Sequence, residues 1–366
     1  MSENEQYNIL WLTHRDPFHP ISGGVGRTIK EVSTRLSEMG YKVTVYSSAF
    51  KGGKDIQQFN DVTILRYGHS IMTHVALPVF LFKNKFDIII NDLGHAVPWL
   101  TPLFFRKKNI VFFHHLHSRS LSGYVNPIIS LAITAIEKCY FLIFKKQVFV
   151  SESDSAKSDL NNLKIKNIRF YKVPPGVDHS LFKSYPKTAS PSLVYFGGLR
   201  KYKRPQESIY ILKAVLSRFP DSMLFVVGSG EELHSMKKLA EKLGVMKKVV
   251  FTGKLGESQL AKIVGSSWLN LHTSVTEGWG FSILEASSAG TPTVAYNVAG
   301  VTDAIDNGIN GFKVLDGDRD AFINAVFDIL VKPKNWWISS ESMAKEYNWD
   351  YTARNWDKII RSLLME

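Results

Sequence analysis

Two carboxylates and a glycine-bounded turn form the part of the sequence with the clearest chemistry. Within T-E-G-W-G-F-S-I-L-E-A, Glu277 lies in the turn and Glu285 lies near the start of an expected helix over 281–289 that Gly290 ends. The amide end of a helix that leaves a glycine turn attracts phosphate, and carboxylates accept paired hydrogen bonds from vicinal hydroxyls. This combination predicts a site for a nucleotide-sugar. The alternative is an ordinary capped helix with two solvated acids.

The elements around this stretch indicate an α/β fold. An apolar run over 268–275 predicts a strand before the turn, and apolar strands alternate with helical segments along both halves of the chain. N-I-L-W-L-T-H opens the first half and is followed by a glycine loop, a helix and a second strand, which is the usual beginning of a doubly wound sheet. A length of 366 residues allows about two such domains.

The stretch around Glu277, with A-G-T-P-T-V-A and G-I-N-G-F-K-V downstream, resembles the donor signature of glycosyltransferase family 4. The resemblance covers nearly the whole chain. It implies a retaining enzyme of the GT-B architecture, in which two Rossmann-like doubly wound domains face each other across a cleft. It also implies that Glu277 is catalytic and orients the donor sugar, that Glu285 holds the ribose hydroxyls, and that amides of Gly280, Phe281 and Ser282 cradle the diphosphate.

The expected organisation has four parts. An N-terminal Rossmann-like, acceptor-binding domain covers 1–182, and a C-terminal nucleotide-sugar-binding domain covers 193–344. The segment 183–192 is rich in Pro, Ser and Lys, which is typical of a linker. The amphipathic segment 345–366 is expected to be a helix, and the resemblance implies that it crosses back to the first domain.

Two other glycine turns are expected near the donor. Gly23 and Gly24 follow the first strand, but the loop lacks the spacing G-x-G-x-x-G and is a weak dinucleotide fingerprint. The resemblance implies that amides of this loop approach the diphosphate and the acceptor; a simple tight turn is the alternative. Gly228 is in a strand-to-helix turn that is expected near the nucleotide.

The turn F-G-G-L-R-K-Y-K-R-P resembles the family segment that places an arginine and a lysine on the diphosphate. Lys203 is at the lysine position, whereas Gly198 occupies the arginine position. Arg200 or Arg204 is therefore expected to supply the missing charge. The departure at Gly198 keeps open a non-catalytic partner subunit that binds a nucleotide-sugar without turnover.

Three histidines end a strand of the first half. In F-F-H-H-L-H, His114, His115 and His117 lie where open α/β sheets bind ligands. The resemblance implies that His114 is a catalytic-site residue that hydrogen-bonds a donor-sugar hydroxyl; a structural cluster is the alternative. No further ligand motif supports zinc, and D-G-D over 316–318 is interpreted as a helix cap. No metal or other cofactor is expected, and the nucleotide-sugar is a substrate.

Composition and charge limit the classes of partner that are expected for this protein. The single cysteine, Cys139, excludes an internal disulfide. Residues 1–190 hold 24 Lys/Arg and 14 Asp/Glu, a balance of +10 in a chain of net charge +12. This basic half predicts an anionic partner: a phosphate-bearing acceptor, an anionic membrane or nucleic acid. No nucleic-acid reading motif is present, so nucleic acid is not expected.

An apolar segment over 126–146 is a candidate for contact with a membrane. With basic residues at Lys83, Lys85 and 106–108, it could lie on a membrane surface; a core helix is an equal alternative. Trp99 with 103–105 is a second candidate patch. The polar N-terminus has no signal-peptide segment, and no uninterrupted apolar run reaches the length that a membrane-spanning helix requires. A cytoplasmic protein is expected, with contact at the inner face of the membrane as an option.

The interpretation is a glycosyltransferase that moves a sugar from a UDP-, GDP- or ADP-linked donor to a lipid-linked sugar, a polysaccharide or another glycan, without a metal. The resemblance implies front-face displacement, in which the leaving phosphate helps to deprotonate the acceptor. The protein then contributes positioning and electrostatics. A nucleotide-sugar epimerase on the same two-domain plan is the alternative enzyme.

Overall fold

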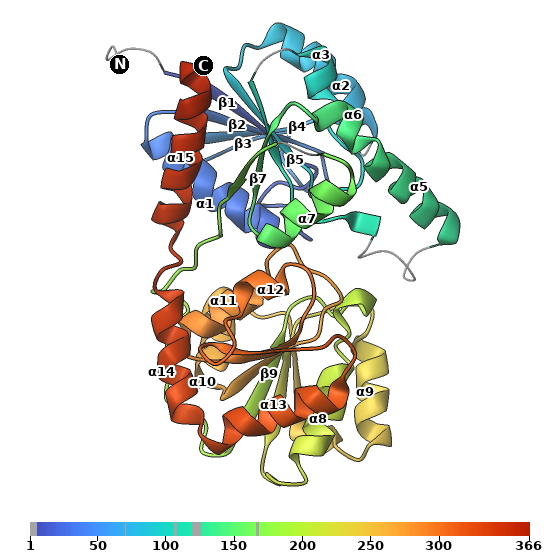
Figure 1. The fold of residues 1–366 in the computed structure, drawn as a ribbon, viewed down its shortest axis with the longest axis vertical. Helices are drawn as coiled ribbons and strands as arrows, with labels where there is room; N and C mark the ends of the chain where they lie inside the picture. The colour runs from blue at the N-terminus through green and yellow to red at the C-terminus, as the bar shows by residue number, and fades with distance from the viewer. Residues whose placement is uncertain (1–5, 70, 106–107, 119–125, 166–167) are drawn as a thin grey trace. The chain divides into compact units, whose positions relative to one another are not determined.

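The structure is a computed structural model that describes residues 6–69, 71–105, 108–118, 126–165 and 168–366. The chain forms two compact units (Figure 1). Unit 1 holds the described residues of Met1–Ser118 and Val125–Gly176 together with Trp349–Glu366, and unit 2 holds Val177–Asn348. Each unit is a doubly wound α/β domain with its own sheet.

The sheet of unit 1 has eight strands in the order β3-β4-β2-β1-β5-β6-β7-β8. All neighbours are parallel except β3 and β4. The central strands are apolar on both faces because helices cover both sides of the sheet. The strands are β1 (Asn8–Leu12), β2 (Lys42–Ser47), β3 (Ile56–Phe59), β4 (Val62–Arg66), β5 (Ile88–Asp92), β6 (Lys108–Phe112), β7 (Val148–Ser151) and β8 (Arg169–Lys172).

Two helix layers enclose this sheet. On one face, α1 and the C-terminal helix α15 pack side by side, and Trp356 of α15 contacts the ring of Trp11 in β1 at a centroid distance of 5.1 Å. Alternate strand residues face the opposite layer, which contains α2, α6 and α7. The helices are α1 (Gly24–Glu38), α2 (Ile71–Lys83), α3 (Thr101–Phe104), α5 (Pro127–Lys138), α6 (Tyr140–Phe144), α7 (Asp154–Asn162) and α15 (Trp349–Met365).

The sheet of unit 2 has six parallel strands in the order β11-β10-β9-β12-β13-β14. The chain leaves β9 toward β10 and later returns to β12 on the other side, which creates a topological switch point between β9 and β12. Ligands bind at the carboxyl ends of strands at such points. The strands are β9 (Ser192–Phe196), β10 (Met223–Val227), β11 (Val249–Gly253), β12 (Leu269–His272), β13 (Thr293–Tyr296) and β14 (Gly311–Val314).

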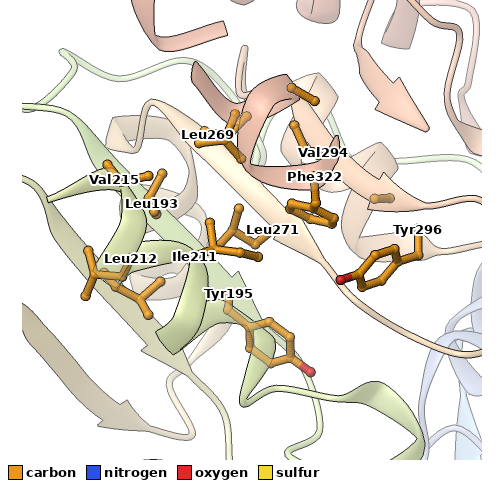
Figure 2. Close-up of a cluster of buried hydrophobic side chains, with 14 of the residues drawn as sticks. Leu193, Tyr195, Ile211, Leu212, Val215, Leu269, Leu271, Val294, Tyr296 and Phe322 are labelled. Atoms are coloured by element: carbon orange, nitrogen blue, oxygen red, sulfur yellow. The ribbon is translucent and has the colours of Figure 1, made fainter. Parts of the chain in front are cut away.

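Figure 2 shows the main core of unit 2, where side chains of β9, β12 and β13 meet α8 and α13. Leu193 and Leu271 of the strands lie among Ile211, Leu212 and Phe322 of the helices. The helical elements are η1 (Lys201–Lys203), α8 (Glu207–Val215), α9 (Leu233–Lys242), η2 (Met246–Lys248), α10 (Glu257–Ser266), α11 (Phe281–Ser288), α12 (Val301–Ala304), α13 (Arg319–Val331) and α14 (Pro333–Ala344). This core fixes the carboxyl ends of β9 and β12.

The predicted linker over 183–192 is instead part of unit 2. The amides of Tyr185 and Thr188 donate to the carbonyls of Gly265 and Ser266 at 3.3 and 3.1 Å. Lys187 Nζ donates to the carbonyl of Ser267 at 2.8 Å and to two oxygen atoms of residues 290 and 291. The division between the units falls after Gly176 rather than after 182. Composition indicates a loop at 183–192, but the loop's partners come from elements far along the chain.

Candidate active site

Three segments of unit 2 meet at the switch point: the turn after β9, the turn after β12 and the start of α11. The amide of Val275 donates to the carbonyl of Tyr202 at 2.9 Å, and Thr273 Oγ1 donates to the carbonyl of Lys203 at 2.8 Å. The amide of Glu277 donates to the carbonyl of Ala299 at 3.0 Å. Strand β12 therefore ends at His272, three residues before the predicted strand end at 275. The same contacts hold the turns after β9 and β12 in place.

Lys203, Glu277, Ser274 and His272 form a compact group, called here the Lys203 cluster. Lys203 Nζ lies 2.9 Å from Glu277 Oε1, and Ser274 Oγ donates to the same oxygen at 2.6 Å. Burial opposes charge on both groups, but their mutual attraction outweighs it. The pKa of Glu277 is lowered to about 2, and the pKa of Lys203 is raised above its ordinary value. Both groups are therefore charged at neutral pH.

His272 joins this cluster, although the sequence interpretation did not include it. Its Nε2 lies 3.5 Å from Glu277 Oε1, and its Nδ1 lies 3.1 Å from Ser282 Oγ in the first turn of α11. Burial, aided by the charge of Lys203 and opposed by that of Glu277, lowers the pKa of His272 to about 4, so its ring is neutral at pH 7. A polar residue at the end of the apolar strand L-N-L-H is the signal that could have indicated it.

The start of α11 is built as the glycine turn predicts. Gly280 precedes the helix with φ of +95°, a left-handed conformation that favours glycine, and Phe281 is the first helical residue. Ser282 and Glu285 are three positions apart and share one side of the helix. Glu285 is buried, so it is not a solvated acid. The structure thus brings Glu277 next to the start of α11, which holds the predicted donor-binding residues 280–285. His272 links the two, because its ring contacts both Glu277 and Ser282.

The two arginine candidates have different environments. Arg204 donates to the carbonyls of Thr273 and Ser274 at 2.8 and 3.1 Å and pairs with Asp316. It therefore supports the strand end of β12. Arg200 is exposed, and its Nε is 3.6 Å from where a Cβ at Gly198 would be. Arg200 thus folds over the glycine that replaces the expected arginine.

Gly228 has a clear steric requirement. A Cβ at this position would lie 1.9 Å from the carbonyl oxygen of Gly197, and its φ is +146°. The turns after β9 and β10 therefore approach each other through backbone alone. The predicted nucleotide contact at Gly228 stays a prediction, but the glycine shapes the turn that leads to Lys203.

In unit 1, His114 is held between two carboxylates. Its Nε2 lies 2.7 Å from Asp92 Oδ1 and its Nδ1 lies 3.4 Å from Glu152 Oε2. Burial would lower the pKa of this 2 % exposed ring, but the two carboxylates raise it to about 10. Thr13 and Thr28 donate to the same carboxylates at 2.6 and 3.0 Å.

This geometry bears on the predicted role of His114. Both ring nitrogens face acids, so the resting geometry does not direct either one at a sugar hydroxyl, and that role stays a prediction. The network ties together the carboxyl ends of β1, β5, β6 and β7. Acids directly at strand ends, in N-D-L and S-E-S, are the sequence signals for Asp92 and Glu152.

The loop that carries Gly23 and Gly24 is anchored by a buried ion pair. Arg66 Nε and Nη2 donate to the two oxygen atoms of Asp16 at 2.7 and 2.8 Å, and neither side chain is exposed. Gly24 begins α1, and a Cβ at Gly23 would meet nothing within 4 Å. Open space at Gly23 is compatible with the approach of a ligand, and the predicted contact itself stays a prediction.

Two parts of the sequence have residue types that can bind metal: the histidines over 114–117 and D-G-D over 316–318. Asp318 caps α13 by accepting from the amide of Ala321 at 2.9 Å, which confirms the predicted cap. Within the described ranges, no group of three or more His, Cys, Asp or Glu residues could hold a metal ion. His117 Nδ1 lies 3.6 Å from Glu137 Oε1, and the rings of His115 and His117 are 5.3 Å apart. Independence from metal remains a prediction.

Two family models match the chain in succession. The model for glycosyltransferase family 4 matches residues 22–181, and the model for glycosyl transferases group 1 matches residues 178–348. Among curated relatives, glycogen synthase of Mycobacterium tuberculosis is 22 % identical, over 91 % of this chain and 89 % of that protein. The GDP-mannose-dependent alpha-(1-6)-phosphatidylinositol monomannoside mannosyltransferase of Mycolicibacterium smegmatis is 25 % identical, over 87 % and 88 %.

Solved structures agree on the fold. Sucrose-phosphate synthase of Thermosynechococcus elongatus superposes with a TM-score of 0.86 at 17 % identity, over 98 % of this chain and 100 % of that one. HepE of Anabaena in complex with UDP-glucose gives a TM-score of 0.78 at 15 % identity, over 97 % and 99 %. With both family models found across its two Rossmann-like units, the chain belongs to the family 4, group 1 glycosyltransferases of GT-B fold and is a transferase enzyme.

Proposed function

We propose that this enzyme transfers a sugar from a nucleoside-diphosphate-sugar to a glycan or lipid-linked acceptor, with retention at the anomeric carbon and without a metal. The observation that carries the proposal is the Lys203 cluster beside the start of α11. It presents one cation, one ionised carboxylate and helix amides at the switch point of unit 2. HepE in complex with UDP-glucose and the GDP-mannose-dependent relative support a donor of this class.

Donor binding would exchange partners within the cluster. Lys203 and Glu277 satisfy each other at 2.9 Å in the structure. An incoming diphosphate takes over the lysine, aided by the amides of Phe281 and Ser282, and Glu277 then accepts hydroxyls of the sugar. Glu285, further along the same side of α11, holds the ribose. Each charge keeps a partner before and after the exchange, so neither is left buried and unpaired.

The protonation states favour assistance by the substrate's own phosphate. A carboxyl whose pKa is lowered to about 2 is a poor base, so Glu277 suits electrostatic stabilisation of an oxocarbenium-like state. His114, whose pKa is raised to about 10, is already protonated at neutral pH. The leaving diphosphate is then the group that accepts the proton of the attacking hydroxyl on the same face. Front-face displacement of this kind gives retention.

The acceptor and the location are part of the proposal. We assign the acceptor to lipid-linked sugars, polysaccharides or other glycans, and we place the enzyme in the cytoplasm at the inner face of a membrane. The basic balance of residues 1–190 supports a phosphate-bearing or membrane-bound acceptor.

A donor screen tests the proposal. UDP-, GDP- and ADP-sugars are compared for protection against thermal unfolding, using the wild type, Glu285→Ala and the control Glu241→Ala, an exposed acid on α9. One donor should protect the wild type and the control but not Glu285→Ala. Transfer with EDTA present and NMR of the product should show the donor's anomeric configuration.

The alternatives predict different results in the same screen. Inversion at the anomeric carbon, or activity abolished by EDTA, would contradict the mechanism. A new sugar formed without acceptor would indicate an epimerase. Protection by a donor without transfer to any acceptor class would indicate a binding-only subunit.

A further inference from the structure

One layer of unit 1 carries large apolar side chains on its outer surface. Helix α2 buries Thr73, Leu77 and Leu81 against the sheet. Its opposite side consists of exposed apolar residues at helical spacing: Ile71, Met72, Val75, Val79 and Phe82. Phe82 is 90 % exposed and Ile71 is 74 % exposed. A helix that is apolar on all sides, with only one side buried in the fold, requires a second apolar environment.

Helix α5 has the same character. Ile128 is 77 % exposed, and Ile129 and Leu131 are also exposed. The helical stretch Pro127–Phe144 is the one in the described chain that is long and apolar enough to cross a membrane, and only 18 % of it is buried. Figure 1 shows α5 reaching outward from the body of unit 1. The core-helix alternative therefore does not hold for α5.

These helices share one side of unit 1. Residues of α2 pack in the same core as Trp99, which lies two residues before the start of α3. Helix α3 contacts α6, and α6 contacts α5. On α3, Leu103 and Phe104 are exposed. Trp99 itself is buried, so its predicted place in an exposed patch is wrong. We call the exposed apolar side chains of α2, α3 and α5 the apolar face.

Lysines border the apolar face. Lys83 and Lys85 are exposed at the end of α2, and Lys138, Lys145 and Lys146 are exposed at the ends of α5 and α6. Over the described residues of 71–105 and 126–146, the acids are Asp87, Asp92 and Glu137, and none is exposed. Of the three basic residues at 106–108 that were expected beside this segment, Arg106 and Lys107 lie outside the described residues. Lys108 Nζ instead donates to the carbonyl of Leu363 in α15. The face is therefore apolar and cationic, with no exposed acid within those segments.

We propose that the apolar face docks unit 1 on an anionic phospholipid bilayer, with α2, α3 and α5 lying in the plane of the lipid headgroups. Apolar side chains enter the acyl boundary while the lysines contact lipid phosphates. A second copy of the chain fits less well, because a two-fold interface would place the same cationic border against itself.

The helix pair α5–α6 is held too firmly in unit 1 to cross the bilayer. Tyr140 and Phe144 of α6 are buried, and Tyr140 Oη donates to the carbonyl of Ala96 at 2.8 Å. Glu137, at the end of α5, is buried and accepts from the amide of Ser118 at 3.2 Å. Spanning would require these contacts to break, whereas docking in the plane keeps them.

Vesicle flotation of the full chain tests the proposal without donor or acceptor, so the result is independent of the transferase proposal. The wild type should bind vesicles that contain phosphatidylglycerol and should bind pure phosphatidylcholine vesicles weakly. Val79→Asp with Phe82→Asp should reduce binding at least tenfold. Lys83→Glu should reduce it about fivefold or more, because a lysine near an anionic surface contributes about a fivefold factor in partitioning.

The matched control is Ile56→Asp, which changes an exposed apolar residue of unit 1 on β3, outside the apolar face. It should bind like the wild type, and all variants should retain the wild-type thermal transition. Equal binding to both vesicle types, or no effect of the α2 variants, would overturn the proposal. So would retention in membranes after alkaline carbonate washing, which indicates spanning, or a dimer in solution that the α2 variants dissociate.

Discussion

The pair Lys203–Glu277 predicts a measurable stability that depends on pH. Burial would raise the pKa of Glu277, but Lys203, His272 and Ser274 together lower it from 4.5 to about 2. At about 1.4 kcal/mol per pKa unit, this corresponds to about 3 kcal/mol of stability in unit 2. The side chains are only 22 % and 15 % exposed, so solvent screens the pair little.

Glu277→Gln keeps the shape of the side chain and the partner for Ser274 but removes the charge. We expect it to lower the free energy of unfolding by about 3 kcal/mol at pH 7, because the lysine is left buried without its counter-charge. A carboxyl with a lowered pKa contributes stability above its unfolded-state value and loses it as pH falls toward the folded-state value. The penalty should therefore shrink as pH falls from 4.5 toward about 2.

Urea denaturation followed by tryptophan fluorescence measures this effect. The cycle comprises the wild type, Glu277→Gln, Lys203→Met and the double variant, and the coupling between the two sites should be about 3 kcal/mol. The double variant should be less destabilised than the two single penalties together, since it leaves no unpaired charge. A penalty below about 0.5 kcal/mol at pH 7, or one that does not change with pH, would refute the reasoning.

Three other substitutions probe the frame of the site. Asp16→Asn should destabilise unit 1 by about 3 to 5 kcal/mol in denaturation experiments, since Arg66 is then buried without its charged partner, and no loss would contradict a buried pair. Gly228→Ala should abolish protection by the donor in thermal shift assays while unit 2 stays folded, because the new Cβ would meet the carbonyl of Gly197 at 1.9 Å. The stability advantage of the wild type over His114→Gln should be full below pH 6.5 and lost as pH rises through about 10, since the folded-state pKa of His114 is raised; an advantage that grows with pH would exclude a charged ring.

The sequence was sufficient for the architecture and for the glycine turn that begins α11. Apolar runs and glycine turns locate the strands and the start of α11, because burial and left-handed backbone conformations depend on residue type at short range. Asp318 as a cap followed from the same local rules. The motif around Glu277 and Glu285 also identified the family.

The partners of individual side chains were decided by the tertiary structure. Arg204 and Arg200 are equivalent candidates in the sequence, but only the fold brings the carbonyls of Thr273 and Ser274 to Arg204. His114 is a strand-end histidine in the sequence, and only the fold places it between Asp92 and Glu152. The tertiary structure also decided which surface is exposed. The sequence of α2 shows that the helix is apolar, but only the fold shows which of its sides is buried and which stays exposed. Hydrogen bonds and ion pairs join residues that are distant along the chain, and local patterns carry no information about such pairings.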